Sequence, residues 1–291
     1  MMAKATIYDM VTERICQILE QGEIPWRKPW VTSERQIPMN LKTRKEYRGI
    51  NIFLLASCGF SSRYWLSFKQ AKDMGGMVRK GEKGSVVVFW KWREKEERDE
   101  VTGKTEIRRI PLLRYYTVFN LDQIDNIAGP EEPETETFEF SPIEQAEQII
   151  KGMPNPPRIT HNEDRAYYRP SQDKVNMPPK NLFKVSAEYF CTAFHELIHS
   201  TGHKSRLNRS GITDISFFGS HEYSKEELIA EFGAAFLCGA AGIENQIVEN
   251  SAAYIQSWLK KLRNNRKWLV TAAAQAQKAA DYILNNKTEE G

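Results

Sequence analysis

The sequence has no closely spaced cysteines and no long apolar run. Its 4 cysteines stand far apart, so neither a disulfide framework nor a cysteine-ligated zinc site is expected. No stretch approaches the ~18 apolar residues that a membrane helix needs. The N-terminus runs into an amphipathic segment, not an apolar signal region. These absences predict a protein that has no membrane partner and works in a reducing, cytoplasmic setting.

Basic and acidic residues are distributed unevenly along the 291-residue chain. Its net charge is +3, but residues 1–130 hold 23 basic and 16 acidic side chains. Within 26–93 the numbers are 15 and 4. Such a basic block is typical of a surface that binds a polyanion, and it excludes an acidic protein that imitates DNA. No Walker-type loop is present, so no nucleotide cofactor is expected.

An acidic, proline-rich segment at residues 127–142 is the best candidate for a linker between two domains. We expect a small mixed α/β nucleic-acid-binding domain over residues 1–126. A mainly helical domain with a small sheet is expected over residues 143–291. The predicted fold class is therefore α+β.

Apolar spacing and turn residues predict the individual elements of both domains. The first domain is expected to hold helices at 7–19 and 67–74 and a β-hairpin with strands at 84–92 and 114–120. In the second domain the expected helices lie at 143–151, 186–201, 224–240 and 249–284, after extended segments around 158–177.

The segment from His195 to His199 reads His-Glu-Leu-Ile-His, an HExxH motif within a helical apolar pattern. Residues i and i+4 share a helix face, so His195 and His199 can bind one zinc ion (Zn²⁺) or another divalent metal. Glu196 is then the expected general base for the metal-bound water that attacks a peptide carbonyl. The alternative is a helix with two polar residues on its exposed face.

A third metal ligand is expected from the helix that begins near Ser224. Glu227 and Glu231 are one turn apart and can both face the HExxH helix. By analogy with glutamate-type zincins, Glu227 is the ligand and Glu231 orients a ligand histidine. The reverse assignment stays open, because Glu227 could instead close a capping box with Ser224. His203 and His221 are interpreted as incidental.

Tyr167 and Tyr168 precede the HExxH helix in an extended segment. A strand beside the metal can align a substrate backbone by β-addition. A tyrosine hydroxyl there could also stabilise the oxyanion, although paired tyrosines more often pack in a core.

Basic residues alternate with aromatic residues between positions 26 and 92. Rings within a cationic groove suit the unpaired bases of single-stranded DNA, whereas duplex recognition more often uses a basic helix. Some of the tryptophans are expected to be core residues instead. The candidate DNA-binding residues are Trp26, Arg27, Lys28, Trp30, Arg44, Tyr47, Arg48, Trp65, Lys69, Arg79, Lys80 and Lys83.

Motifs from both halves resemble one family. They include Trp26-x-x-Pro29-Trp30, Tyr47-Arg48-Gly49-Ile50-Asn51, Val118-Phe119-Asn120-x-Asp122-Gln123, Tyr167-Tyr168-x-Pro170, Phe194-His195-Glu196-Leu197-Ile198-His199 and Glu226-Glu227-Leu228-Ile229-Ala230-Glu231. Together they resemble the ArdC-type antirestriction proteins of conjugative plasmids and related mobile elements. The N-terminal half is also similar to the start of plasmid TraC-type primases.

The resemblance implies single-stranded DNA binding by the first domain, a zincin fold in the second, and protection of incoming DNA from host restriction. Two hypotheses remain open. In the first, a zinc peptidase cleaves an unidentified, DNA-bound protein substrate. In the second, the protein shields single-stranded DNA, and its metal site is structural or not needed.

Overall fold

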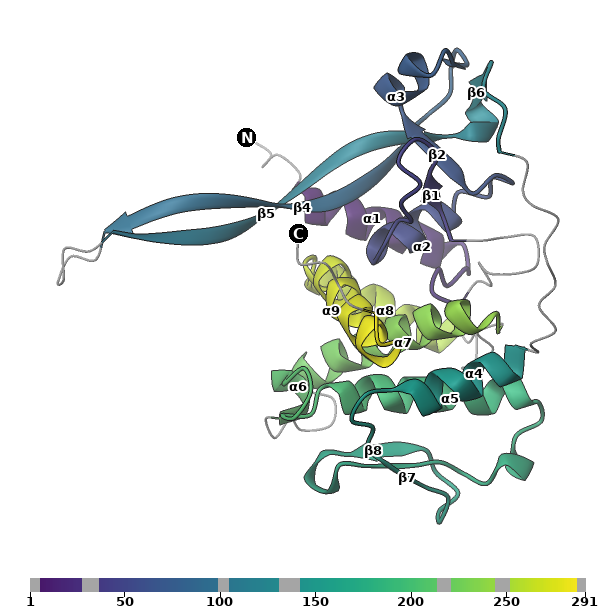
Figure 1. Ribbon diagram of the computed structural model, residues 1–291, viewed down its shortest axis with the longest axis vertical. Helices are drawn as coiled ribbons and strands as arrows, with labels where there is room; N and C mark the ends of the chain where they lie inside the picture. Colours follow the sequence, from purple (N-terminus) through teal and green to yellow (C-terminus); the bar gives the residue numbers. More distant parts are fainter. Residues whose placement is uncertain are drawn as a thin grey trace.

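The structure describes six stretches of the chain, which fold as an α+β protein. These are residues 6–27, 37–98, 105–130, 142–213, 221–243 and 252–286 of a computed structural model. Figure 1 shows a mixed upper part, from which a long hairpin projects, above a mainly helical lower part with a small sheet. The predicted fold class is confirmed. Within these stretches, no helix is long and apolar enough to cross a membrane.

The first half of the chain alternates short helices with strands. Its elements are α1 (Ile7–Glu20), β1 (Met39–Asn40), α2 (Ile50–Ala56), β2 (Tyr64–Ser67), α3 (Phe68–Asp73), β3 (Met77–Val78), β4 (Ser85–Arg98), β5 (Thr105–Asn120), the 3-10 turn η1 (Leu121–Gln123) and β6 (Ile124–Asp125). One sheet has the order β1-β2-β5-β4, and β3 pairs separately with β6. The predicted β4–β5 hairpin is confirmed, and both strands are longer than predicted.

The second half is mainly helical. Its elements are α4 (Pro142–Gly152), β7 (Arg158–Thr160), β8 (Tyr167–Arg169), η2 (Pro170–Gln172), β9 (Lys174–Asn176), η3 (Lys180–Leu182), α5 (Ser186–Thr201), α6 (Ser210–Thr213), α7 (His221–Ala241), α8 (Ala252–Asn264) and α9 (Trp268–Ile283). The prediction of a single helix at 249–284 is wrong, because α8 ends at Asn264 and a separate helix, α9, begins at Trp268. Asn265 lies just after the end of α8, and its side-chain amide donates to the Lys261 carbonyl at 2.9 Å.

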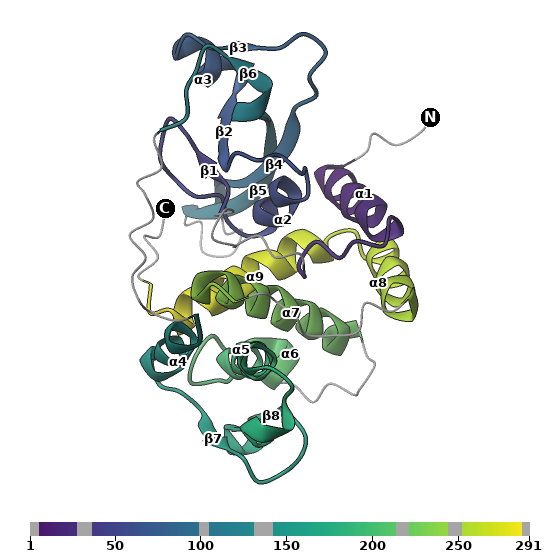
Figure 2. The same cartoon turned by 90° about the vertical axis from the view of Figure 1, so that its right-hand side faces the viewer.

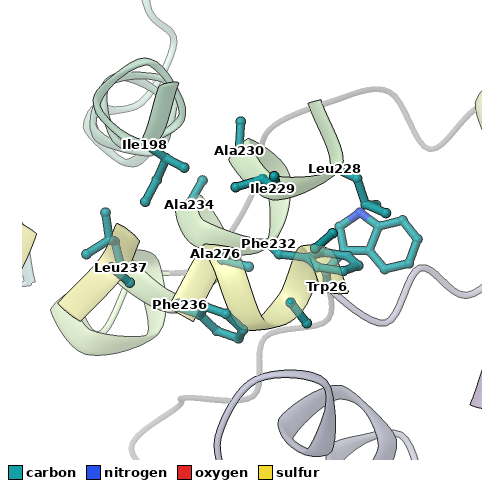
Figure 3. Packing of buried hydrophobic residues seen from close by; sticks show 14 of the residues in the cluster. Trp26, Ile198, Leu228, Ile229, Ala230, Phe232, Ala234, Phe236, Leu237 and Ala276 are labelled. Atoms are coloured by element: carbon teal, nitrogen blue, oxygen red, sulfur yellow. The ribbon is translucent and has the colours of Figure 1, made fainter. Parts of the chain in front are cut away.

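Helices α5, α7 and α9 pack against one another and form the main hydrophobic core. Gly233 on α7 allows a close approach to α5, because a Cβ there would lie 2.5 Å from Cδ1 of Ile198. Figure 3 shows Ile198 next to the small side chains of Ala230 and Ala234. The position of α5 against α7 matters because these two helices carry the predicted metal ligands.

The start of the chain also packs on these C-terminal helices. Helix α1 contacts α8 and α9, and Figure 2 shows it alongside α8. Trp26 is 0% exposed, with its ring 5.1 Å from Phe232 and 6.3 Å from Trp258 between centroids. Residues 131–141, most of the predicted linker, lie outside the described residues. The division into domains at 127–142 therefore stays a prediction.

Candidate metal centre

Helix α5 carries the HExxH motif in its second half. Its buried side chains Phe194, Leu197 and Ile198 fix that half against the core. His195 and His199 lie one turn apart, and their Nε2 atoms are separated by 3.1 Å. Two imidazole nitrogens therefore point at the same place, as the i, i+4 spacing predicts.

Glu227 on α7 approaches both of these nitrogens. Its Oε2 lies 3.5 Å from Nε2 of His195, and its Oε1 lies 3.5 Å from Nε2 of His199. One possible ligand atom from each of the three residues lies within 4.8 Å of the others. In the part of the chain that the structure describes, this is the one cluster of His, Cys, Asp and Glu with such spacing.

Glu231 lies one turn further along α7 but is engaged elsewhere. Its Oε2 accepts a hydrogen bond from the Trp26 indole nitrogen at 2.8 Å and another from the Tyr254 hydroxyl. The expectation that Glu231 orients a ligand histidine is therefore wrong. Its carboxylate instead joins α7 to Trp26 of the N-terminal segment and to Tyr254 of α8. Of the two candidate glutamates, the geometry brings Glu227 to the histidines.

Glu226, which sequence reasoning missed, is the carboxylate that faces the outer nitrogen of a ligand histidine. Its Oε1 lies 3.5 Å from Nδ1 of His199, and its side chain is buried. Burial raises the pKa of Glu226, but the nearby His199 and the guanidinium of Arg209 outweigh it and lower the pKa overall. Glu226 therefore stays ionised beside the site.

Arg209 holds Glu226 from the turn between α5 and α6. Its Nε donates to both carboxylate oxygens, at 3.2 and 3.1 Å. Its other nitrogens donate to the Ile198 carbonyl at 2.8 Å and to the Thr201 hydroxyl at 2.6 Å. No local pattern indicates this role, because Arg209 lies 17 positions before Glu226 and outside the predicted helices.

The electrostatics of the cluster favour a bound cation. Burial opposes protonation of His199, but Glu226, Glu227 and Glu196 together outweigh it and raise its pKa to about 9. Two imidazoles and a carboxylate are a common donor set for zinc and for other divalent metals. The residues present therefore fit a divalent metal held by His195, His199 and Glu227.

Glu196 lines a cleft of about 820 Å³ beside the three candidate ligands. Its side chain is largely buried but borders the open space. The cleft extends from the candidate ligands to β8 and to the turn that follows α5. His203 also lines it but lies outside the ligand cluster, and the side chain of His221 lies outside the described residues.

Tyr167 and Tyr168 line the same cleft from β8. The described sheet has the order β7-β9-β8, so β8 is an edge strand next to the metal cluster. The hydroxyl of Tyr167 donates to Glu163 at 2.6 Å, and that of Tyr168 donates to Asp173 at 2.9 Å. The strand thus lies where an edge strand that aligns a substrate is expected. Both tyrosine hydroxyls are already hydrogen-bonded to carboxylates.

Three of the predicted DNA-binding rings are buried. Trp26 is 0%, Tyr47 is 7% and Trp65 is 2% exposed. The prediction that they stack on bases is wrong for this structure, because a ring enclosed in a core offers no face to a base. Lys28 and Trp30 lie outside the described residues.

The predicted basic residues fall into two groups. Arg27 lies over the Tyr254 ring, and Arg48 pairs with Asp281 of α9, so both contact the C-terminal helices. The others lie on the surface of the N-terminal half, where Arg79 is also bound to Glu82 and Asp125. These exposed residues are Arg44, Lys69, Arg79, Lys80 and Lys83.

Comparisons with known protein families agree with this geometry. Residues 144–275 match the family described as zincin-like metallopeptidase. Residues 5–119 match the N-terminal domain of the anti-restriction factor ArdC. Fold and site together define a zincin-like metallopeptidase domain joined to an ArdC-type N-terminal domain.

Individual relatives cover almost the whole chain. The metal-free crystal structure of antirestriction protein ArdC from plasmid R388 is 40% identical, has a TM-score of 0.72, and the match covers 97% of this chain and 98% of that one. For the Mn(II)-bound structure the values are 38%, 0.74, 99% and 100%. The uncharacterized protein y4eC of Sinorhizobium fredii is 36% identical over 95% of this chain and 91% of its own length. The chain belongs to the ArdC family of antirestriction proteins.

Two further relatives are much longer. The DNA primase TraC of Escherichia coli is 38% identical over 97% of this chain, but the chain spans only 20% of the length of TraC. A second TraC primase of the same organism gives 38% identity, and the chain spans 27% of it.

Proposed function

We propose that this chain is a cytoplasmic antirestriction protein of a mobile element that binds single-stranded DNA and carries a zinc-dependent peptidase site. The observation that carries the peptidase assignment is the cluster of His195, His199 and Glu227 within 4.8 Å, with Glu196 in the adjoining cleft. Membership of the ArdC family supports the antirestriction role. The Mn(II)-bound structure of ArdC supports the binding of a divalent metal by this chain.

The residues around the cleft have distinct roles in this proposal. A zinc ion bound there supplies Lewis acidity and lowers the pKa of a bound water. Glu196 takes the proton of the attacking water and passes it to the leaving amine. Because β8 is an edge strand of the described sheet, its backbone is able to align an extended peptide by β-addition.

The basic N-terminal half supports the nucleic-acid part of the proposal. Residues 1–130 hold 23 basic and 16 acidic side chains, and several of the basic ones are exposed. DNA binding would place the peptidase site beside proteins on the transferred strand. The substrate class we propose is therefore a protein bound to single-stranded DNA.

The decisive experiment replaces Glu196 with glutamine and measures transfer of DNA into a restricting host. Glu196→Gln removes the base but keeps the size and polarity of the side chain, so metal content should stay unchanged. We expect protection to fall to the level of a strain without the protein. Glu188→Gln, two turns earlier on α5, is the matched control and should protect normally.

Undiminished protection by a metal-loaded Glu196→Gln protein would contradict peptidase-dependent antirestriction. It would favour the alternative in which the chain shields single-stranded DNA and the metal site is not needed. Purified wild-type protein and the variant should then be compared for cleavage of single-stranded-DNA-binding proteins, which tests proteolysis separately from protection.

A further inference from the structure

The β4–β5 hairpin extends far beyond the sheet to which it belongs. Strand β4 has 14 residues, which at ~3.4 Å per residue corresponds to roughly 45 Å. In Figure 1 its outer part projects away from the body of the protein. Among the described side chains of the hairpin, the buried ones, such as Val87 and Val118, lie at the inner ends of the strands.

The register of the hairpin assigns each side chain to one of two faces. Pairing runs without a bulge, with Phe89 opposite Arg114 and Lys91 opposite Leu112. Opposed residues share a face, and neighbours along a strand alternate between faces. One face therefore carries Phe89, Lys91, Arg93, Arg114 and Tyr116, which we call the basic face.

The other face of the hairpin has a different character. It carries Trp90, Trp92, Glu94, Arg109 and Tyr115. Here the acid and the base neutralise each other, because Glu94 forms an ion pair with Arg109 at 3.4 Å. The hairpin thus has one neutral aromatic face and one aromatic face with a cationic excess.

Side chains of the basic face are open to solvent. Phe89 is 42% and Tyr116 is 39% exposed, and their rings meet edge to face at 5.7 Å. Lys91, Arg93 and Arg114 are also exposed. Within the described residues, none of these three cations forms an ion pair. Among the described side chains, two exposed rings therefore lie beside three cations that form no ion pair.

We propose that the basic face of this hairpin is the surface that holds single-stranded DNA. Exposed rings stack on unpaired bases, and interspersed cations contact the phosphates between them. A duplex fits less well, because its bases are already stacked and cannot reach Phe89 or Tyr116. The inference rests on the proposed DNA-binding function, and it moves the stacking role from the buried Trp26, Tyr47 and Trp65 to the hairpin.

The test uses the full-length chain and a fluorescent 20-nucleotide oligo-dT, with binding followed by anisotropy between 50 and 200 mM salt. The triple variant Lys91→Ala, Arg93→Ala, Arg114→Ala should bind at least ~10-fold more weakly at the lowest salt. Its slope of log affinity against log salt should fall by about 2, since each phosphate contact on a single strand contributes ~0.7. Phe89→Ala should weaken binding roughly 5-fold or more, through loss of one stacked base.

Trp92→Ala on the opposite face is the matched control, and its affinity should remain within about twofold of wild type. Equal melting temperatures establish that all variants fold, since every substituted side chain is exposed. If wild type binds and the triple variant binds equally well, or if duplex of the same length binds as tightly as single strand, the inference is overturned. If wild type fails to bind oligo-dT, both the proposed function and the inference fail.

Discussion

Arg209 carries a full charge in a buried position beside the metal-site helices. Its guanidinium contacts the carboxylate of Glu226, the Ile198 carbonyl and the Thr201 hydroxyl. A buried ion pair of this kind loses most when one partner is removed, because the other charge is left without compensation. Arg209 therefore fixes Glu226, and Glu226 in turn faces the ring of His199.

The variant Arg209→Met should reduce both stability and metal binding. The free energy of unfolding should fall by roughly 3–5 kcal/mol, because Glu226 becomes an unpaired buried charge. Metal affinity should fall by about 10- to 100-fold, as for other residues that orient a ligand histidine. Urea unfolding and chelator competition measure the two effects. Wild-type metal affinity in a folded Arg209→Met protein would contradict the orienting role of Glu226.

Trp26 offers a second test at the scale of one residue. Trp26→Phe keeps a buried ring but removes the indole N–H that donates to Glu231. The unfolding free energy should fall by about 1.5–3 kcal/mol, the typical contribution of one hydrogen bond to a charged group. The Glu231 carboxylate keeps the hydrogen bond from the Tyr254 hydroxyl. Affinity for single-stranded DNA should be unchanged, because the ring is not at the surface. Weakened DNA binding at unchanged stability would contradict this expectation and would show that Trp26 contributes to DNA binding.

At this scale, the sequence predicts what is local and misses what depends on distant contacts. His195, Glu196 and His199 follow from spacing within one helix, whereas the turn spacing of the next helix leaves both Glu227 and Glu231 as possible ligands. The partner of Glu226 could not be predicted, because Arg209 reaches it only through the folded turn after α5. Burial of Trp65 likewise depends on packing, which an alternation of basic and aromatic residues does not reveal.

Among the elements, the β8–β9 pair is held beside the metal site by one charged contact. Arg206, whose side chain is fully buried, donates to Asp173 at 3.0 Å through its Nη1. The same arginine donates to the Ser200 carbonyl at the end of α5, at 2.7 Å. The edge strand that borders the cleft is therefore tied to the helix that carries the histidines.

Asp173→Asn should weaken this connection in a pH-dependent way. Burial raises the pKa of Asp173, but Arg206 and Tyr168 outweigh it and lower the pKa below its ordinary value. A lowered pKa means that the carboxylate stabilises the fold above the unfolded-state pKa of ~3.9. At pH 7 the variant should be less stable by about 1–3 kcal/mol. The difference should shrink as the pH falls through the lowered pKa, which urea unfolding across pH 7 to pH 2 checks; a constant difference would contradict the ionic contribution.

Helices with strong apolar periodicity were predicted almost to their ends, as α5 illustrates. The outer half of the β4–β5 hairpin was not, because its strands are highly charged there and their hydrogen bonds come from pairing, not from burial. The break between α8 and α9 was also missed. Residues on both sides have good helical spacing, and a single side-chain hydrogen bond from Asn265 marks the end of the first helix.

In the whole molecule, the start of the chain packs on the C-terminal helices. The two halves therefore share a core, which two independently folded domains would not. Helix α1 and Trp26 cover apolar side chains such as Phe232 and Trp258. Arg48 reaches α9 as well, through Asp281. The N-terminal half is therefore physically connected to the helix that carries Glu227, through the contact between Trp26 and Glu231.

A fragment of residues 143–291 should consequently be less stable than the same residues in the full chain. Removal of α1 and Trp26 exposes apolar surface, so the fragment should melt at lower temperature and associate at high concentration. Addition of a fragment of residues 1–126 should restore part of the melting temperature. A monodisperse 143–291 fragment that melts like the full chain would contradict the shared core.

Metal content decides whether His195, His199 and Glu227 form the ligand set on which the peptidase assignment depends. Wild type, Glu227→Ala and Glu231→Ala should be purified in parallel, loaded with zinc, freed of excess metal and assayed by elemental analysis. We expect one metal ion per chain in wild type and in Glu231→Ala, and little in Glu227→Ala. Retention of metal by Glu227→Ala, together with its loss from Glu231→Ala, would contradict it.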